Sequence, residues 1–204
     1  MTADRDANHV FSEDLEDWLR GDTPKTLGEL GSAFGEKSFA VTILLLMFVP
    51  ALPLPTGGIT HVFEVITVLV ALQMVLGRRA LWLPRRFKER ELGASITGKA
   101  VPFIIRRVRW FEKHSHPRLA ALFGHIWFIR ILGLLVIVLT IGAALAPPFS
   151  GLDTLPALGV VTISLSIILE DAVVLGIGAL IGTGGIVLII TIGAALAHYL
   201  RGLL

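Results

Sequence analysis

One acidic residue stands inside a run of apolar side chains, where an ionisable group is unusual. Glu64 lies within the stretch from Ile59 to Gly77, three residues after His61, and residues at i and i+3 share one face of a helix. Ionisable groups inside membranes often act as proton relays, ion sites or counter-ions to a substrate. The alternative is a carboxylate near a helix N-terminus, stabilised by the helix dipole and by interfacial water. Glu64 and His61 are therefore the first candidates for an intramembrane polar site.

Two further features could contribute to the same site. Glu170 and Asp171 separate two apolar stretches, either as a functional carboxylate pair or as an ordinary charged helix end at the membrane surface. Prolines and glycines interrupt the apolar runs, and such tips either expose backbone carbonyls and helix N-termini to a small ion or an anionic headgroup or are compact turns. The tip residues are Pro53, Pro55, Gly57, Gly58, Pro147 and Pro148.

The arginine-rich middle of the chain is interpreted as a membrane-surface feature. Orientation in the membrane and binding of anionic lipid explain it better than nucleic-acid binding, so no nucleic-acid partner is expected. The expected headgroup contacts are Arg85, Arg86, Arg106, Arg107 and Arg109.

No feature of the sequence points to an enzyme or to a cofactor. The triplet from His114 to His116 has no acidic or cysteine cluster beside it, so no metal site is expected, and the chain contains no cysteine. No nucleophile elbow, zinc motif or nucleotide loop occurs.

The composition indicates that lipid surrounds most of the chain. The mean hydropathy is +0.78, hydrophobic residues make up 54% and charged residues 17%, whereas soluble domains contain about 25% charged residues. The acidic first thirty or so residues lack the apolar core of a cleavable signal peptide. We therefore predict an all-α, polytopic integral membrane protein.

The apolar runs are short and broken, which predicts hairpins. The first run ends at Pro50 after roughly 12–15 helical residues, about 20 Å, which is less than the ~30 Å hydrocarbon core. The hairpin therefore either crosses with a thin first arm or is re-entrant. The last run is interrupted by Gly182 to Gly185, which predicts a broken helix or a shallow hairpin. The predicted regions are 1–33 (acidic, with an amphipathic helix), 34–77 (first hairpin), 78–123 (basic, interfacial), 124–171 (second hairpin) and 172–204 (C-terminal segment).

Charge asymmetry predicts the orientation. Acidic residues dominate before Ala33 and basic residues dominate from Arg78 to Arg130, so the positive-inside rule places the N-terminus and residues 78–123 in the cytoplasm. Amphipathic patterns predict a helix around Phe11 to Leu19, a second from Thr26 toward Phe34, and an interfacial helix from Val101 to Lys113.

The two hairpins resemble each other. A shift of 93 positions aligns Pro55 with Pro148, Gly58 with Gly151 and Leu76 with Leu169. The alternatives are a duplication, parallel or inverted, and a chance similarity between two apolar hairpins. Small residues four apart also recur, for packing within one chain or across a homodimer: Gly142 and Ala146, Gly178 and Gly182, and Gly193 and Ala197.

Several motifs match a known family. FGEKSFA (34–40), PLPTGG (53–58), ALQMVLGRRALWLPRRF (71–87) and RRVRWFEKHSHPRL (106–119) resemble those of the ExoD family of bacterial membrane proteins. Where that family tends to have Asp-Gly after the penultimate helix, this chain has Asp171-Ala172. Residues carried by the resemblance as motif or interface positions are Glu36, Gln73, Arg78, Trp82, Glu112 and Arg118, with Glu36 expected to pair with Arg78 or Arg79.

The resemblance implies an inner-membrane protein associated with exopolysaccharide synthesis and, in some members, with alkali tolerance. It implies no established reaction. Two hypotheses follow: a transporter-like, lipid- or ion-handling protein with a polar site near the hairpin tips, or a non-transporting accessory subunit of the polysaccharide machinery.

Overall fold

The structure is a computed structural model that describes residues 11–34, 37–52, 59–78, 81–82, 88–89, 91, 93, 97–98, 101–114, 120–147 and 150–201. The regular elements of these residues are helices, as the all-α prediction requires. In chain order they are α1 (Phe11–Arg20), α2 (Leu27–Ala33), α3 (Ser38–Phe48), α4 (Ile59–Val75), α6 (Val101–His114), α7 (Ala120–Phe123), α8 (Ile126–Ala144), α9 (Thr154–Leu169) and α10 (Ala172–Arg201).

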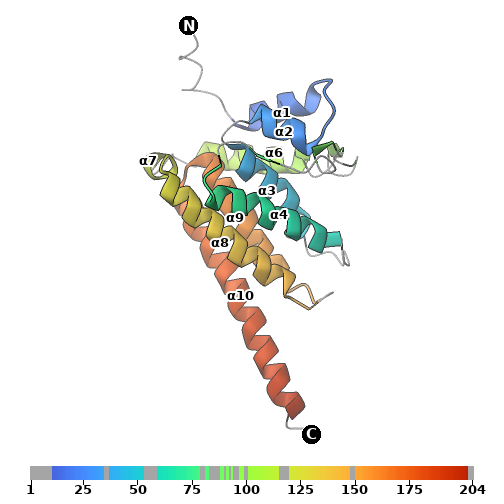
Figure 1. Cartoon of the computed structure of the whole chain (residues 1–204), viewed down its shortest axis with the longest axis vertical. Helices are drawn as coiled ribbons and strands as arrows, with labels where there is room; N and C mark the ends of the chain where they lie inside the picture. The colour runs from blue at the N-terminus through green and yellow to red at the C-terminus, as the bar shows by residue number, and fades with distance from the viewer. Residues whose placement is uncertain are drawn as a thin grey trace.

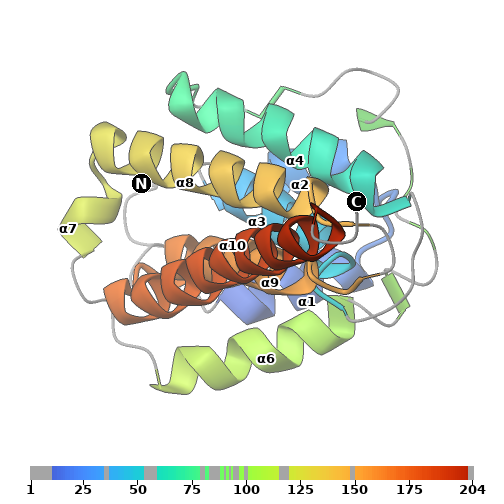
Figure 2. The same cartoon turned by 90° about the horizontal axis from the view of Figure 1, so that it is seen from below.

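The helices form a bundle with a cap. Helices α3, α4, α8 and α9 pack against one another, and α10 lies along α9 before it continues past the bundle to the C-terminus (Figure 1). Helices α1, α2 and α6 lie across the end of the bundle that is farthest from the C-terminus (Figure 1). Figure 2, seen from the C-terminal side, shows α10 crossing the bundle between α8 and α6.

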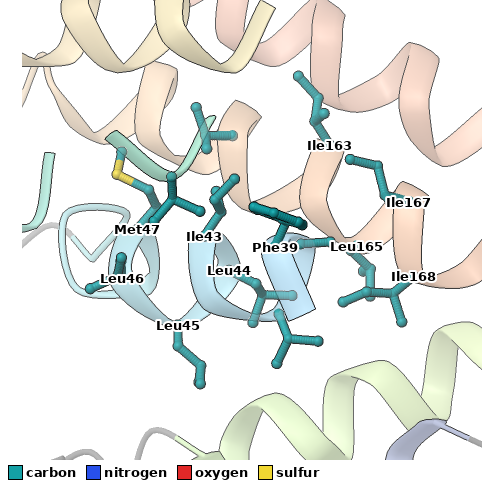
Figure 3. Packing of buried hydrophobic residues seen from close by; sticks show 14 of the residues in the cluster. Phe39, Ile43, Leu44, Leu45, Leu46, Met47, Ile163, Leu165, Ile167 and Ile168 are labelled. Carbon is teal, nitrogen blue, oxygen red and sulfur yellow. The ribbon is translucent and has the colours of Figure 1, made fainter. Parts of the chain in front are cut away.

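Helix α3 is the centre of the bundle. Its residues are apolar on every side, and all of them except Phe48 are buried. Figure 3 shows Phe39 and Ile43 of α3 facing Ile163 and Ile167 of α9. Its 11 residues rise only about 16 Å, which is short of a ~30 Å hydrocarbon core. Helices α2, α4 and α9 contact α3 and enclose its buried side chains.

Two helices are long and apolar enough to cross a membrane. They are α8, with 19 residues, and the segment Ala172–Ala195 of α10, with 24 residues. Helices α3, α4 and α9 are apolar but shorter. Together with the apolar composition, α8 and α10 indicate a membrane protein, while the number of crossings stays a prediction.

The amphipathic helices pack on the protein itself. Helix α1 buries Phe11, Leu15 and Trp18, and it contacts α6. Helix α2 begins as predicted at Thr26, whose hydroxyl accepts a hydrogen bond from the Glu29 amide at 3.1 Å. Of the two alternatives for the apolar stripe of the first helix, docking on the protein or on the lipid surface, the structure shows docking on the protein core.

Helix α6 has two different faces. Val101, Ile104, Ile105 and Val108 are buried in the core. Arg109, predicted to contact lipid headgroups, forms an ion pair with Glu16 of α1 at 2.5 Å while its side chain stays 43% exposed. The opposite face of α6 exposes Arg106 and Arg107.

Helix α10 corrects the prediction of a broken C-terminal segment. It runs without interruption through Gly182 to Gly185, because Gly182 and Gly185 serve close packing and not a break. A Cβ on Gly159 of α9 would lie 2.4 Å from the Cα of Gly182, and one on Gly185 would lie 2.5 Å from Pro156 Cδ. Close backbone contact between α9 and α10 offsets the cost of about 1 kcal/mol per helical glycine.

This packing predicts that Gly159→Ala destabilises the protein. The added methyl would force α10 away from α9, at a cost of about 1–3 kcal/mol. Gly184→Ala is the matched control, because a Cβ on Gly184 meets nothing within 4 Å. The free energy of unfolding in mixed detergent micelles should fall for Gly159→Ala alone, and equal values for the two variants would refute the packing argument.

Candidate functional site

The structure brings Glu64 and His61 together on α4. Nδ1 of His61 and Oε2 of Glu64 lie 2.7 Å apart and share a hydrogen bond. The Glu64 side chain is 2% exposed, whereas that of His61 is 47% exposed. The pair therefore links a buried carboxyl group to the surface of the bundle.

Stabilisation by a helix N-terminus does not account for Glu64. Helix α4 begins at Ile59 and has no acidic residue in its first turn, and the dipole effect falls off beyond that turn. Burial also removes the carboxyl group from interfacial water. Its second oxygen, Oε1, is buried and has no hydrogen-bond partner among the described residues.

Two buried hydroxyl groups lie on the helices that meet at this acid. Thr67 of α4 and Thr140 of α8 are both 0% exposed, and the Oγ1 atom of each lacks a hydrogen-bond partner among the described residues. Gly133 of α8 packs against Ala71 of α4. Helices α4 and α8 run antiparallel (Figure 1), so this contact sets their register. Thr140 is seven residues after Gly133, and Glu64 is seven residues before Ala71. Seven residues span about 10 Å along a helix axis, so Thr140 lies level with Glu64.

These oxygen atoms form a polar strip in an apolar interface. A buried polar group without a partner costs about 1–3 kcal/mol, so these three buried oxygens favour a small occupant such as water or a cation. The strip is the arrangement in the described residues that best fits an intramembrane polar site.

Glu170 and Asp171 lie elsewhere and serve the turn between α9 and α10. Glu170 adopts a left-handed backbone conformation with φ of 53°, and its carboxylate lies 3.3 Å from Lys37 Nζ. The Asp171 carboxylate accepts a hydrogen bond from the Val173 amide at 2.8 Å and so caps α10. Glu170 therefore fits the interpretation as a charged helix end, whereas Asp171 is a buried helix cap.

The predicted grouping of Glu64 with Asp171 is not formed. Glu170 borders a cavity that Gly77, after the C-terminal end of α4, also lines. Glu64 is thirteen residues earlier, which corresponds to about 20 Å along a helix. The two pairs of charged residues thus lie at opposite ends of α4.

Gln73 has a role that the motif alone did not reveal. Its side-chain amide donates hydrogen bonds to the carbonyl oxygens of Leu69 at 3.1 Å and Trp82 at 2.9 Å. Its carbonyl oxygen accepts one from the Trp82 amide at 2.8 Å. Gln73 therefore ties the segment after α4 back onto the helix, with the Trp82 ring 60% exposed.

The other motif and tip residues have structural partners where they are described. Glu112 of α6 accepts a hydrogen bond from the Ser12 amide at 3.0 Å. The carbonyl of Pro147 accepts one from the Ser150 hydroxyl at 2.7 Å, as in a compact turn. Arg78 is exposed. The predictions for Pro53, Pro55, Gly57, Gly58, Pro148, Glu36, Arg79, Arg85, Arg86, Arg118, Ser115 and His116 lie outside the described residues.

Comparison with known proteins gives a consistent result. The family described as "Exopolysaccharide synthesis, ExoD" matches residues 11–191. An uncharacterized protein of Synechocystis sp. is 28% identical over 175 residues, which is 82% of this chain and 80% of that protein. Protein ExoD of Rhizobium meliloti is 30% identical over 166 residues, which is 78% of this chain and 66% of that protein. No solved structure matches the chain.

Proposed function

The chain belongs to the ExoD family, and from this premise we propose that it is a transporter-like, ion-handling protein of exopolysaccharide synthesis in the bacterial inner membrane. The observation that carries the proposal is Glu64 of α4, a buried acid whose Oε1 has no hydrogen-bond partner in the part of the chain that the structure describes. Buried ionisable groups in membranes are expensive and mark ion or proton pathways.

Proton movement would use the exposed and the buried member of the pair in turn. Nε2 of His61 takes a proton from water, and the Nδ1 proton passes to Oε2 of Glu64 across their 2.7 Å contact. The imidazole ends with its other nitrogen protonated, and the carboxylate ends as a neutral acid. Histidine suits this transfer because either ring nitrogen can carry the proton, so one accepts while the other donates.

We also propose that the two hairpins are parallel repeats. In each hairpin, the residue with positive φ follows the end of the second helix: Gly77 in the first hairpin and Glu170 in the second. These two positions are 93 residues apart. The first helix of each hairpin packs on the second helix of the other: α3 packs on α9, and α8 packs on α4. The same hydrogen bond closes each helix: Arg78 N–H to Gln73 O at 3.0 Å, and Asp171 N–H to Ser166 O at 3.2 Å.

The test is Glu64→Gln, which keeps the size of the side chain but removes its titratable group. In liposomes that contain the protein and a pH-sensitive dye, we expect proton flux to fall at least tenfold. Complementation of a host that lacks its ExoD protein should fail as well. Glu13→Gln, at an exposed position of α1, is the control, and wild-type flux and complementation by Glu64→Gln would exclude the ion-handling function.

A second function, an accessory subunit, is favoured by the outer face of α6. Arg106, Arg107, Phe103 and Trp110 are exposed there, with the Arg107 guanidinium 5.1 Å from the Phe103 ring centre. A basic and aromatic face suits anionic lipid headgroups or a partner in the polysaccharide machinery. Normal complementation by an Arg106→Gln/Arg107→Gln double variant would exclude this function.

We propose that this function involves no covalent chemistry and no cofactor. The proposed orientation has residues 78–123 in the cytoplasm, because basic residues gather there, and the N-terminus on the same side, because α1 contacts α6. Gly193 on the outer part of α10 has no neighbour within 4 Å of an added Cβ. This surface is available for a homodimer contact, whereas Gly178 and Gly182 are used inside the chain.

A further inference from the structure

A cavity opens at the end of the bundle opposite the C-terminus. Helices α3 and α8 begin there and α4 and α9 end there (Figure 1). The cavity volume is 440 Å³, which is within the roughly 300–1,000 Å³ of small-molecule sites. Its walls are mixed, and their apolar residues include Phe39, Met74, Phe123, Ile129 and Ile167.

Cationic side chains gather at this cavity. Lys37 and Arg78 line it, with Glu170 as the carboxylate among its described lining residues. Lys37 is already engaged, since its Nζ lies 3.0 Å from the Ile168 carbonyl oxygen and 3.3 Å from Glu170 Oε1. The exposed side chain of Arg78 forms no ion pair with a described residue. Among the described residues, no carboxylate therefore occupies its guanidinium donors.

A third cation, Arg130, lies against the cavity wall. A Cβ on Gly77 would be only 3.0 Å from Arg130 Nη2, so the missing side chain lets the guanidinium approach the cavity. The Nε atom of Arg130 is buried and has no hydrogen-bond partner among the described residues. The guanidinium carbon stands 5.0 Å from the ring centre of Trp127, which fixes its plane.

Exposed tryptophans mark the membrane level of this end. The Trp127 ring is 71% exposed and the Trp82 ring 60% exposed. Tryptophan is enriched at the boundary between hydrocarbon and headgroups, and basic residues are enriched on the cytoplasmic side. The cavity thus lies where a phosphate headgroup and the first part of a hydrocarbon chain would both be present.

From these observations we infer that the cavity binds the phosphate of an anionic lipid, with Arg78 and Arg130 as the phosphate ligands and the apolar walls around the hydrocarbon. Guanidinium groups match phosphate oxygens in pairs. A free phosphate ion would leave the apolar walls without an occupant. The site is at the opposite end of α4 from Glu64, so the inference does not depend on the proposed ion pathway.

The test is native mass spectrometry of the detergent-solubilised full chain with three probes. They are dihexanoyl phosphatidic acid, dihexanoyl phosphatidylcholine and inorganic phosphate at equal concentrations. We expect one phosphatidic acid per chain to be retained, with at least tenfold weaker retention of the other two probes. Equal retention of phosphatidic acid and phosphatidylcholine would overturn the inference, and so would equal retention of inorganic phosphate.

Variants of the two arginines test whether the lipid phosphate binds at the cavity. Arg78→Gln and Arg130→Gln should each weaken phosphatidic acid retention at least tenfold. Arg78 is exposed, so its variant tests the inference even if Arg130→Gln fails to fold. Arg201→Gln, at the distant end of α10, is the matched control and should bind as the wild type does. Unchanged retention in Arg78→Gln would overturn the inference, whatever the proton flux of the protein.

Discussion

Replacement of Glu64 by methionine is expected to make the protein more stable and inactive at once. Methionine has nearly the shape of glutamate but no polar oxygen, so it removes a buried carboxyl group whose Oε1 has no partner among the described residues. The unfolding free energy should rise by about 1–3 kcal/mol, the cost of one unsatisfied buried group. Proton flux and complementation should both be lost.

A gain in stability together with a loss of activity distinguishes a functional acid from a structural one. An acid that stabilises the fold would leave a less stable protein when replaced, whereas a functional site retains unfavourable groups at a cost in stability. The measurement is denaturation in mixed detergent micelles. Val65→Met is the control, because Val65 is the next residue of α4 and is 61% exposed. A loss of stability in Glu64→Met alone would assign Glu64 to the structure.

Local patterns predicted those parts of the molecule that depend on one helix. The spacing of Phe11, Leu15 and Trp18 identified the buried face of α1, and the three-residue spacing of His61 and Glu64 predicted that they share one face. Pro50 follows the end of α3. In each case the deciding interaction lies within a few residues along the chain, where sequence spacing and spatial distance agree.

Other features depend on partners that are distant in sequence. The same run from Gly182 to Gly185 would suit a break in a lone helix or close packing in a pair, and Gly159 of α9 decides for packing. The ion pair of Arg109 with Glu16 of α1 likewise joins two residues that are 93 positions apart in the sequence. The cavity also combines parts of five helices, α3, α4, α7, α8 and α9, which no local spacing could indicate.

The largest loss of stability is expected for Gln73→Met. Methionine fills similar space but makes none of the three hydrogen bonds of the Gln73 side chain. The amide and the carbonyl of Trp82 would both lose their partner, at a cost of about 2–4 kcal/mol for bonds of about 1 kcal/mol each and for the polar groups left unpaired. Leu72→Met, at the preceding and 43% exposed position, is the control and should have little effect.

Hydrogen exchange at Trp82 tests the same substitution locally. The Trp82 amide donates a hydrogen bond to Gln73 at 2.8 Å, so its hydrogen exchange should accelerate in Gln73→Met. The exchange rates of the α8 amides should change only as far as the global free energy of unfolding changes. Because Gln73 fixes the segment that follows Arg78, the variant should also weaken retention of phosphatidic acid at the cavity while Arg78 and Arg130 are both present. If Trp82 exchange stayed at the wild-type rate, Gln73 would not hold this segment, and the position of Arg78 would need another cause.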